Sequence, residues 1–141
     1  MKDNNIFISY SGHDEFEASL LKFAIEKSLG KGVTAWTFRT DQAPDQKGIA
    51  ESIKNHVRNS AATIFLASPS TLESGATHWM ELAYADAYNI PTYVLMHHLD
   101  YHRLRDAEKG VPPLILQSQC NAAVEWRRII RDLKAKLKRR R

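Results

Sequence analysis

Residues 6–14 of the chain read IFISYSGHD, an apolar run that passes into small polar residues. The stretch from Asn5 to Tyr10 has the composition of a β-strand, and a helix is expected to follow it. A strand that leads through small polar residues into a helix is typical of the binding edge of an open α/β sheet. This stretch therefore predicts an α/β fold with its functional edge near Tyr10.

Apolar, β-rich runs alternate with helix-compatible stretches along the rest of the chain. This alternation predicts a five-stranded parallel sheet with helices on both faces. The predicted strands are residues 5–10, 33–38, 61–67, 90–96 and 112–116. The helices after the first are predicted from Ile49, Ile53 and Val57, over residues 78–88, and from Trp126, Ile130, Leu133 and Leu137.

The first helix is predicted to begin at a capping box, because Ser11 and Asp14 have the required spacing. Gly30 supplies a stop signal at the other end. The apolar residues that recur at helical intervals are expected to form its buried face: Phe16, Leu20, Phe23 and Ala24. Between the second strand and the second helix, residues 39–48 are expected to form a long polar loop.

Length and composition indicate one globular domain over residues 1–141. The chain has 141 residues, of which 43% are hydrophobic and 26% are charged, values close to the globular average. A single cysteine excludes an intramolecular disulfide, and no apolar run approaches the ~20 residues of a membrane span. Without a signal peptide at the start, a soluble cytoplasmic protein is expected.

The positive charge is concentrated in the basic C-terminal segment, residues 125–141. This segment holds nine Lys or Arg residues and two acids, so the remainder, with 11 basic and 14 acidic residues, carries a net charge of −3. A solvated helix end whose cations complement the helix dipole is the favoured interpretation. Binding to nucleic acid is not expected, because a basic face or groove is not indicated, and no membrane partner is expected.

Ligands of doubly wound sheets gather beyond the carboxyl ends of the strands. Here that edge comprises residues 10–14, 38–48, 68–81 and 96–100, which are expected to form one cleft. Glu81 is the outstanding acid among them, because it begins an otherwise apolar helix. The alternative is a first-turn glutamate that stabilises the helix N-terminus.

Three segments in this order resemble the Toll/interleukin-1 receptor (TIR) domain family: residues 6–14, residues 60–68 (SAATIFLAS) and residues 81–85 (ELAYA). The resemblance covers residues 4–96 and implies a flavodoxin-like fold. In members that cleave NAD, including bacterial ones, an essential glutamate precedes a small-residue stretch, which implies that Glu81 is catalytic. NAD+ would then be the substrate, with no cofactor, and the product ADP-ribose or a cyclic ADP-ribose signal. The resemblance further implies a role in bacterial immune or antiphage defence.

Several residues near the predicted cleft are candidates for substrate binding. Phe38 could stack on a base or nicotinamide, and Arg39 could pair with the pyrophosphate. The alternative is an aromatic residue at a strand end beside a solvated arginine. Hydroxyl and backbone N–H groups at Ser9, Tyr10 and Ser11 could contact a phosphate at a helix N-terminus, although Ser11 is equally suited to capping that helix.

Lys47 and Trp79 complete the candidate set, and both depart from the family pattern. Lys47-Gly48 stands where a Pro-Gly pair is common, and Trp79 lies two residues before Glu81 instead of four, which leaves its role open. In the family, the loop that corresponds to residues 39–48 covers the substrate and contacts neighbouring domains. Self-association through this loop is therefore expected, together with a downstream effector or an upstream sensor protein.

Metal chemistry has little support, because His97, His98 and Asp100 lack the spacing of a helical site and Cys120 stands alone. Two further functions stay open. One is a non-catalytic TIR signalling module that assembles with other domains. The other is a nucleoside deoxyribosyltransferase-like enzyme, whose approach to its glutamate is echoed by residues 73–77.

Overall fold

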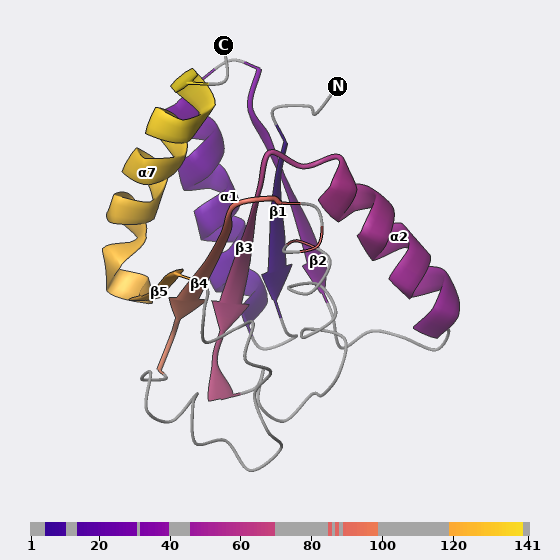
Figure 1. The fold of residues 1–141 in the computed structure, drawn as a ribbon. Coiled ribbons are helices and arrows are strands. Elements are labelled where there is room, and N and C mark those ends of the chain that lie inside the picture. Colours follow the sequence, from indigo (N-terminus) through magenta and orange to yellow (C-terminus); the bar gives the residue numbers. More distant parts are fainter. Residues whose placement is uncertain are drawn as a thin grey trace.

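A computed structural model of the chain describes residues 5–10, 14–30, 32–39, 46–69, 85, 87, 89–98 and 119–139. Five strands form one parallel sheet in the order β2-β1-β3-β4-β5, which confirms the predicted fold class (Figure 1). The strands are β1 (Asn5–Tyr10), β2 (Thr34–Arg39), β3 (Ala62–Ala67), β4 (Thr92–Met96) and β5 (Gln119–Ala122). The helices are α1 (Glu15–Leu29), α2 (Gln46–Arg58) and α7 (Trp126–Arg139), with a short 3₁₀ helix, η2 (Ala123–Glu125), before α7.

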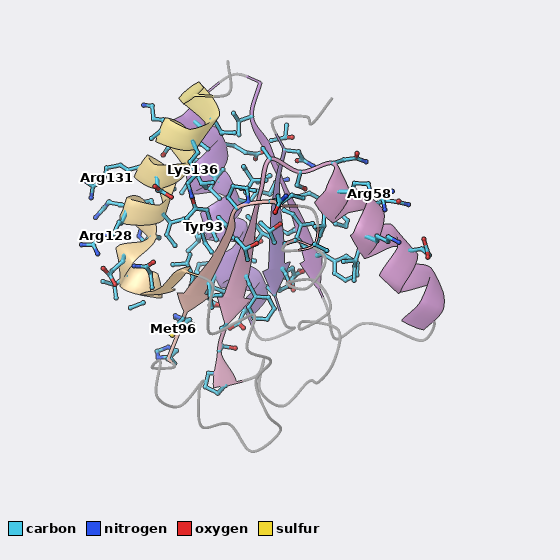
Figure 2. All side chains as sticks on the ribbon, viewed as in Figure 1. Arg58, Tyr93, Met96, Arg128, Arg131 and Lys136 are labelled. Carbon is cyan, nitrogen blue, oxygen red and sulfur yellow. The ribbon has the colours of Figure 1, made fainter. Side chains whose placement is uncertain are left out.

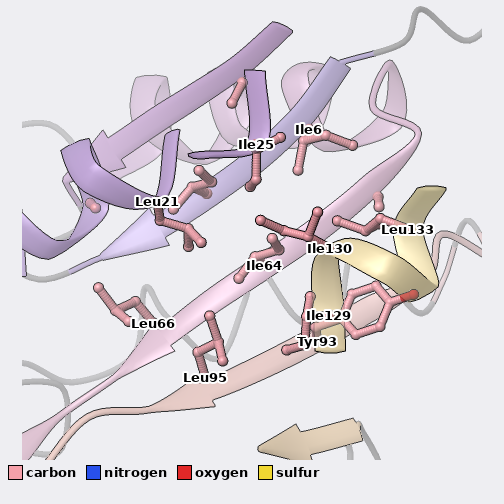
Figure 3. Close-up of a cluster of buried hydrophobic side chains, with 14 of the residues drawn as sticks. Ile6, Leu21, Ile25, Ile64, Leu66, Tyr93, Leu95, Ile129, Ile130 and Leu133 are labelled. Carbon is pink, nitrogen blue, oxygen red and sulfur yellow. The ribbon is translucent and has the colours of Figure 1, made fainter. Parts of the chain in front are cut away.

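Helices cover both faces of the sheet. Alternate residues of a strand point to opposite faces, so Ile6 and Ile8 of β1 join the cluster beneath α1 and α7, shown in Figure 3. Phe7 points the other way and packs with Ile53 and Val57 of α2. The central strand β3 is buried along its whole length, as its continuous apolar composition predicts.

A polar contact ties α7 to the sheet. The Tyr93 hydroxyl of β4 donates a hydrogen bond to the carboxylate of Asp132, and Lys136 forms an ion pair with the same carboxylate at 3.1 Å. The Lys136 ammonium also lies 4.9 Å from the centre of the Tyr93 ring (Figure 2). Burial, and then the hydrogen bond and the negative charge of Asp132, raise the pKa of Tyr93 above its ordinary value.

The predicted buried face of α1 is wrong for three of its four residues, whereas the fourth, Ala24, is half-buried and packs against the core. The side chains of Phe16, Leu20 and Phe23 are 71%, 54% and 62% exposed. The residues that face the sheet are instead Ala18, Leu21 and Ile25. Two apolar stripes coexist on this helix, and the larger side chains form the outer one.

The predicted capping box at the start of α1 is also wrong. Asp14 itself occupies the N-cap position, and its side chain makes no capping hydrogen bond, because its carboxylate is engaged by Ser68. Ser11 lies outside the described residues. The predicted stop is confirmed at Gly30, which caps α1 with a φ of 82° that a residue without a side chain adopts readily.

Two boundaries differ from the prediction. The fifth strand of the sheet is Gln119–Ala122, whereas the apolar segment expected to form it, residues 112–116, lies outside the described residues. Since β5 is at the edge of the sheet, polar residues are compatible with it and apolar content is a poor guide. The polar segment predicted over 39–48 is shorter, because Arg39 ends β2 and α2 begins at Gln46.

None of the helices within the described ranges combines the length and the apolar character needed to cross a bilayer.

Candidate functional site

The strand order places a topological switch point between β1 and β3. From β1 the chain moves outward to β2 and then returns to the other side of β1 to form β3. In open α/β sheets, ligands bind beyond the carboxyl ends of the strands at such a switch point. The residues that end these two strands are consequently the first candidates for a binding site.

A buried hydrogen bond crosses this switch point. The hydroxyl of Ser68, the residue after β3, donates to a carboxylate oxygen of Asp14 at the start of α1, over 2.5 Å. Both residues are almost completely buried, with 3% and 4% of their surfaces exposed. An uncommon buried carboxylate thus fixes the loop after β3 against the N-terminus of α1, where the helix dipole favours negative charge.

Sequence reasoning did not single out Asp14 or Ser68 as a pair. Their positions were the only available signal, because Ser68 directly follows β3 and Asp14 directly precedes α1. Nothing in the sequence, however, indicates that residues 54 positions apart meet.

Ser9 and Tyr10, both predicted to bind substrate, lie within the end of β1. Ser9 is fully buried, and its hydroxyl has no hydrogen-bond partner among the described residues. Tyr10 is 7% exposed and belongs to the core cluster on the α1 side of the sheet. The two residues are therefore buried at the carboxyl end of β1. Their predicted contacts with substrate stay predictions.

Phe38 is the outermost member of an aromatic row on the α2 side of the sheet. Its ring centre lies 5.5 Å from that of Trp36 and 6.4 Å from that of Phe7. Trp36 stacks in turn on His56 of α2, with 3.6 Å between the ring centres. Phe38 pairs with Ser9 and Arg39 with Tyr10 in the β1–β2 register, so both candidates sit at the carboxyl edge.

The other candidates are placed only in part. Arg39 ends β2, and Lys47 lies in the first turn of α2 and not in a loop, but their side chains lie outside the described residues. Ser11, Trp79 and Glu81 lie outside them altogether, and so does Asp100.

Near Glu81 in sequence, the buried Ala85 packs with Phe7 of β1 and with Val57, near the end of α2. The backbone oxygen of Ala85 accepts a hydrogen bond from Ile90 N–H at 2.9 Å. Because Ile90 lies just before β4, Ala85 is held at the amino end of the sheet. The chain that leaves the carboxyl end of β3 has therefore reached the amino end of the sheet at Ala85.

His97 and His98 follow β4, with their ring centres 4.1 Å apart. His98 has a φ of 54°, which turns the chain directly after the strand. Within the described ranges, no group of three His, Cys, Asp or Glu side chains could hold a metal ion.

Comparison with known proteins agrees with this architecture. A family model of the TIR domain matches residues 6–139. The solved structure of a metazoan TIR-STING receptor from C. gigas is similar, with a TM-score of 0.57 and 20% identity over 96% of this chain. The chain spans only 40% of that receptor.

Two other solved structures match at nearly full length. A conserved protein from Enterococcus faecalis V583 has a TM-score of 0.60 and 19% identity, covering 97% of this chain and 98% of its own. An oxidoreductase from Corynebacterium diphtheriae has a TM-score of 0.62 and 12% identity, covering 97% and 96%. At these identities the likeness establishes the fold alone. No curated protein matches the chain.

Proposed function

Because the chain belongs to the TIR domain family, we propose that it cleaves the bond between nicotinamide and ribose in NAD+. Glu81 is the proposed catalytic residue, and NAD+ is a substrate and not a cofactor. The proposed setting is the bacterial cytoplasm, in immune or antiphage defence, with an effector or sensor protein as partner.

The reaction needs one well-placed carboxylate. The bond between C1′ of the ribose and the nicotinamide nitrogen breaks, and its electron pair stays with nicotinamide. Since this leaving group is cationic in NAD+, it departs as a neutral molecule without a general acid, unlike the leaving group of an ordinary glycoside. The carboxylate of Glu81 would stabilise the positive charge that develops on the ribose. Addition of water at C1′ and loss of one proton give ADP-ribose, and attack by the adenine ring gives a cyclic product instead.

The observation that carries the proposal is the Asp14–Ser68 hydrogen bond at the switch point. It fixes the start of the chain segment that connects β3 to β4, and Ala85 fixes the other end of this segment at the amino edge. In the helix predicted over residues 78–88, Glu81 precedes Ala85 by one turn, on the side of the carboxyl edge. A glutamate there would face the switch point between β1 and β3.

The remaining candidates take supporting roles in this proposal. Phe38 would stack on the base or nicotinamide, and Arg39 and Lys47 would contact the phosphates. Ser9, Tyr10 and Ser11 would line the phosphate end, and Trp79 would contact the substrate beside Glu81. Self-association through residues 39–48, which include the start of α2, would close the cleft.

One observation favours a second candidate function, a non-catalytic assembly module. The outer apolar stripe of α1, formed by Phe16, Leu20 and Phe23, is exposed, as expected of a surface that contacts other proteins. A module of this kind would need no substrate.

Incubation with a panel of substrates separates these functions. The chain should be incubated with NAD+ and, in parallel, with deoxynucleosides, and the products resolved by chromatography. We expect nicotinamide and ADP-ribose or a cyclic form from NAD+, and no free base from the deoxynucleosides. Base release from deoxynucleosides would support a deoxyribosyltransferase-like enzyme, and no product from either substrate would support the assembly module.

A further inference from the structure

A groove runs along the outer side of α1 and has a volume of about 930 Å³. It lies on the face of the sheet opposite α2, and its floor reaches β3 and β4. His97 and His98, which follow β4 at the carboxyl edge, form one end of it. The residues that shape it are Leu20 and Phe23 of α1, Leu66 and Leu95 on the floor, and Val124 and Trp126 on the far wall. Its lining is therefore mainly apolar.

Large apolar side chains on both walls are exposed to solvent. Phe23 is 62% exposed on one wall, and Val124 is 83% exposed on the other. Phe16, Leu20 and Phe23 follow one another at four and three residues, so they form a continuous ridge on α1. A ridge with this spacing beside an apolar groove is the surface into which a helix packs.

Positive charge lies on α7 next to the wall at Trp126, although these cations do not themselves line the groove. Arg127, Arg131 and Lys134 are exposed on α7 and follow one another by about one turn, which puts them on one helix face. None of the three has an ion-pair partner among the described residues, although Arg127 lies 4.8 Å from the centre of the Trp126 ring. Figure 2 shows Arg128 and Arg131 projecting from α7 away from the sheet.

The neighbouring acids do not neutralise these cations. Glu125 pairs with Arg128 at 3.0 Å, and Asp132 pairs with Lys136. On the opposite wall, Lys27 of α1 adds another exposed cation, 5.5 Å from the centre of the Phe23 ring. The groove thus has an apolar interior between two cationic margins.

We propose that this groove binds an acidic amphipathic helix of another protein. The apolar face of such a helix fits the walls at Phe23 and Trp126, and its acidic flanks meet Arg131 and Lys134. Glu17 also lines the groove, so a hydrogen-bond donor on the bound helix is favoured at this point.

Charge and shape make this occupant the favoured one. Two copies of this chain would bring identical cationic margins together, which is repulsive. A bilayer would place hydrocarbon against the carboxylate of Glu17, which lines the groove, and this is costly. The groove meets the carboxyl edge at His97 and His98, but Ser9, Tyr10 and Phe38, the described candidates for substrate binding, do not line it. The proposal therefore does not depend on cleavage of NAD+.

The test uses two synthetic fluorescent peptides of about 18 residues, long enough to form a helix in water. Both carry leucine at helical spacing, and the other positions are mainly glutamate in one peptide and lysine in the other. Anisotropy with the full chain should show the glutamate peptide binding at least about tenfold more tightly, with an affinity that falls as salt rises.

Variants locate the binding surface. Phe23→Ser and Arg131→Glu should each weaken binding of the glutamate peptide at least about fivefold. Lys54→Glu, which makes the same charge change on α2, should leave the affinity unchanged. Melting temperatures close to that of the wild type show that each variant is folded.

Several results would overturn the proposal. These are equal affinity for the two peptides, no binding of either, or binding that Phe23→Ser and Arg131→Glu leave intact. Tighter binding to vesicles with phosphatidylserine or to duplex DNA would assign the surface to a lipid or a nucleic acid instead. A dimer in light scattering that Phe23→Ser dissociates would assign it to a second copy.

Discussion

Ser68 and Asp14 are held together by one buried hydrogen bond at the carboxyl edge of the sheet. Ser68→Ala removes a donor from a buried carboxylate, and we expect a loss of about 1–3 kcal/mol in the free energy of unfolding. Urea unfolding measures this loss. The control is Ser28→Ala on the exposed side of α1, which should change stability by less than about 0.5 kcal/mol. Equal effects of the two substitutions would contradict the structural role of the bond.

Tyr93 offers a prediction for alkaline pH. Its pKa in the folded protein is raised above the ordinary value of 10.0 by burial and by Asp132. Below about pH 10 both states hold the phenol proton, so the stabilisation is fully present. As pH rises further, the unfolded chain ionises first and the stabilisation is lost.

Tyr93→Phe isolates this effect. At neutral pH the variant should be less stable by about 1.5 kcal/mol, because it lacks the hydrogen bond to Asp132. Above pH 10 the difference between wild type and variant should shrink, since only the wild type has this ionising group. Denaturant unfolding at several pH values measures it. A difference that stays constant or grows with pH would show that the Tyr93 pKa is not raised.

Among single residues, the sequence predicts the location only of those that stand at the end of a strand. Phe38, Arg39 and Tyr10 were placed at the carboxyl edge because strand ends can be read from composition, and the register confirms their location. Pairings across the sequence, such as Asp14 with Ser68, depend on the packing of distant elements and leave no local pattern. The burial of Ser9 and Tyr10 was missed for the same reason.

Among the elements, α1 shows how periodicity can mislead. Phe16, Leu20 and Phe23 repeat at helical spacing, and so do Ala18, Leu21 and Ile25, but only the second set faces the sheet. Periodicity identifies a helix without saying which of two apolar stripes is buried. In contrast, α7 has one apolar stripe, so its core residues Ile130 and Leu133 were predicted correctly.

A matched pair of substitutions tests this assignment of the two faces. Leu21→Ala should lower the free energy of unfolding by about 2–4 kcal/mol, because Leu21 is 7% exposed and packs in the core. Phe23→Ala removes a larger side chain, yet it should cost less than about 0.5 kcal/mol, because Phe23 is exposed. Chemical denaturation measures both. The reverse order of effects would show that the Phe23 stripe is the buried one.

The boundaries of a strand are predicted well only where the strand is buried. The central strands β1, β3 and β4 are mainly apolar, and their predicted positions agree with the structure to within two residues. The edge strand β5 lies at Gln119–Ala122 and was missed, because one side of it has no neighbouring strand.

For the whole molecule, the strand order β2-β1-β3-β4-β5 is the feature that connects fold to function. It puts the topological switch point between β1 and β3, where ligands of such sheets bind, and the Asp14–Ser68 bond crosses this point. The exposed groove beside α1 reaches this edge at His97 and His98. The proposed chemistry and the proposed protein contact are tested by different substitutions, because neither Phe23 nor Arg131 is a proposed substrate-binding residue.

The central claim, NAD+ cleavage through Glu81, is tested most directly by nicotinamide release from wild type and Glu81→Gln. The substitution keeps the shape of the side chain and removes the negative charge that opposes the developing cation. We expect release to fall at least about 100-fold with an unchanged melting temperature, whereas Glu51→Gln on the exposed side of α2 should retain full activity. A folded Glu81→Gln protein that releases nicotinamide at the wild-type rate, or a wild type that releases none, would contradict the account.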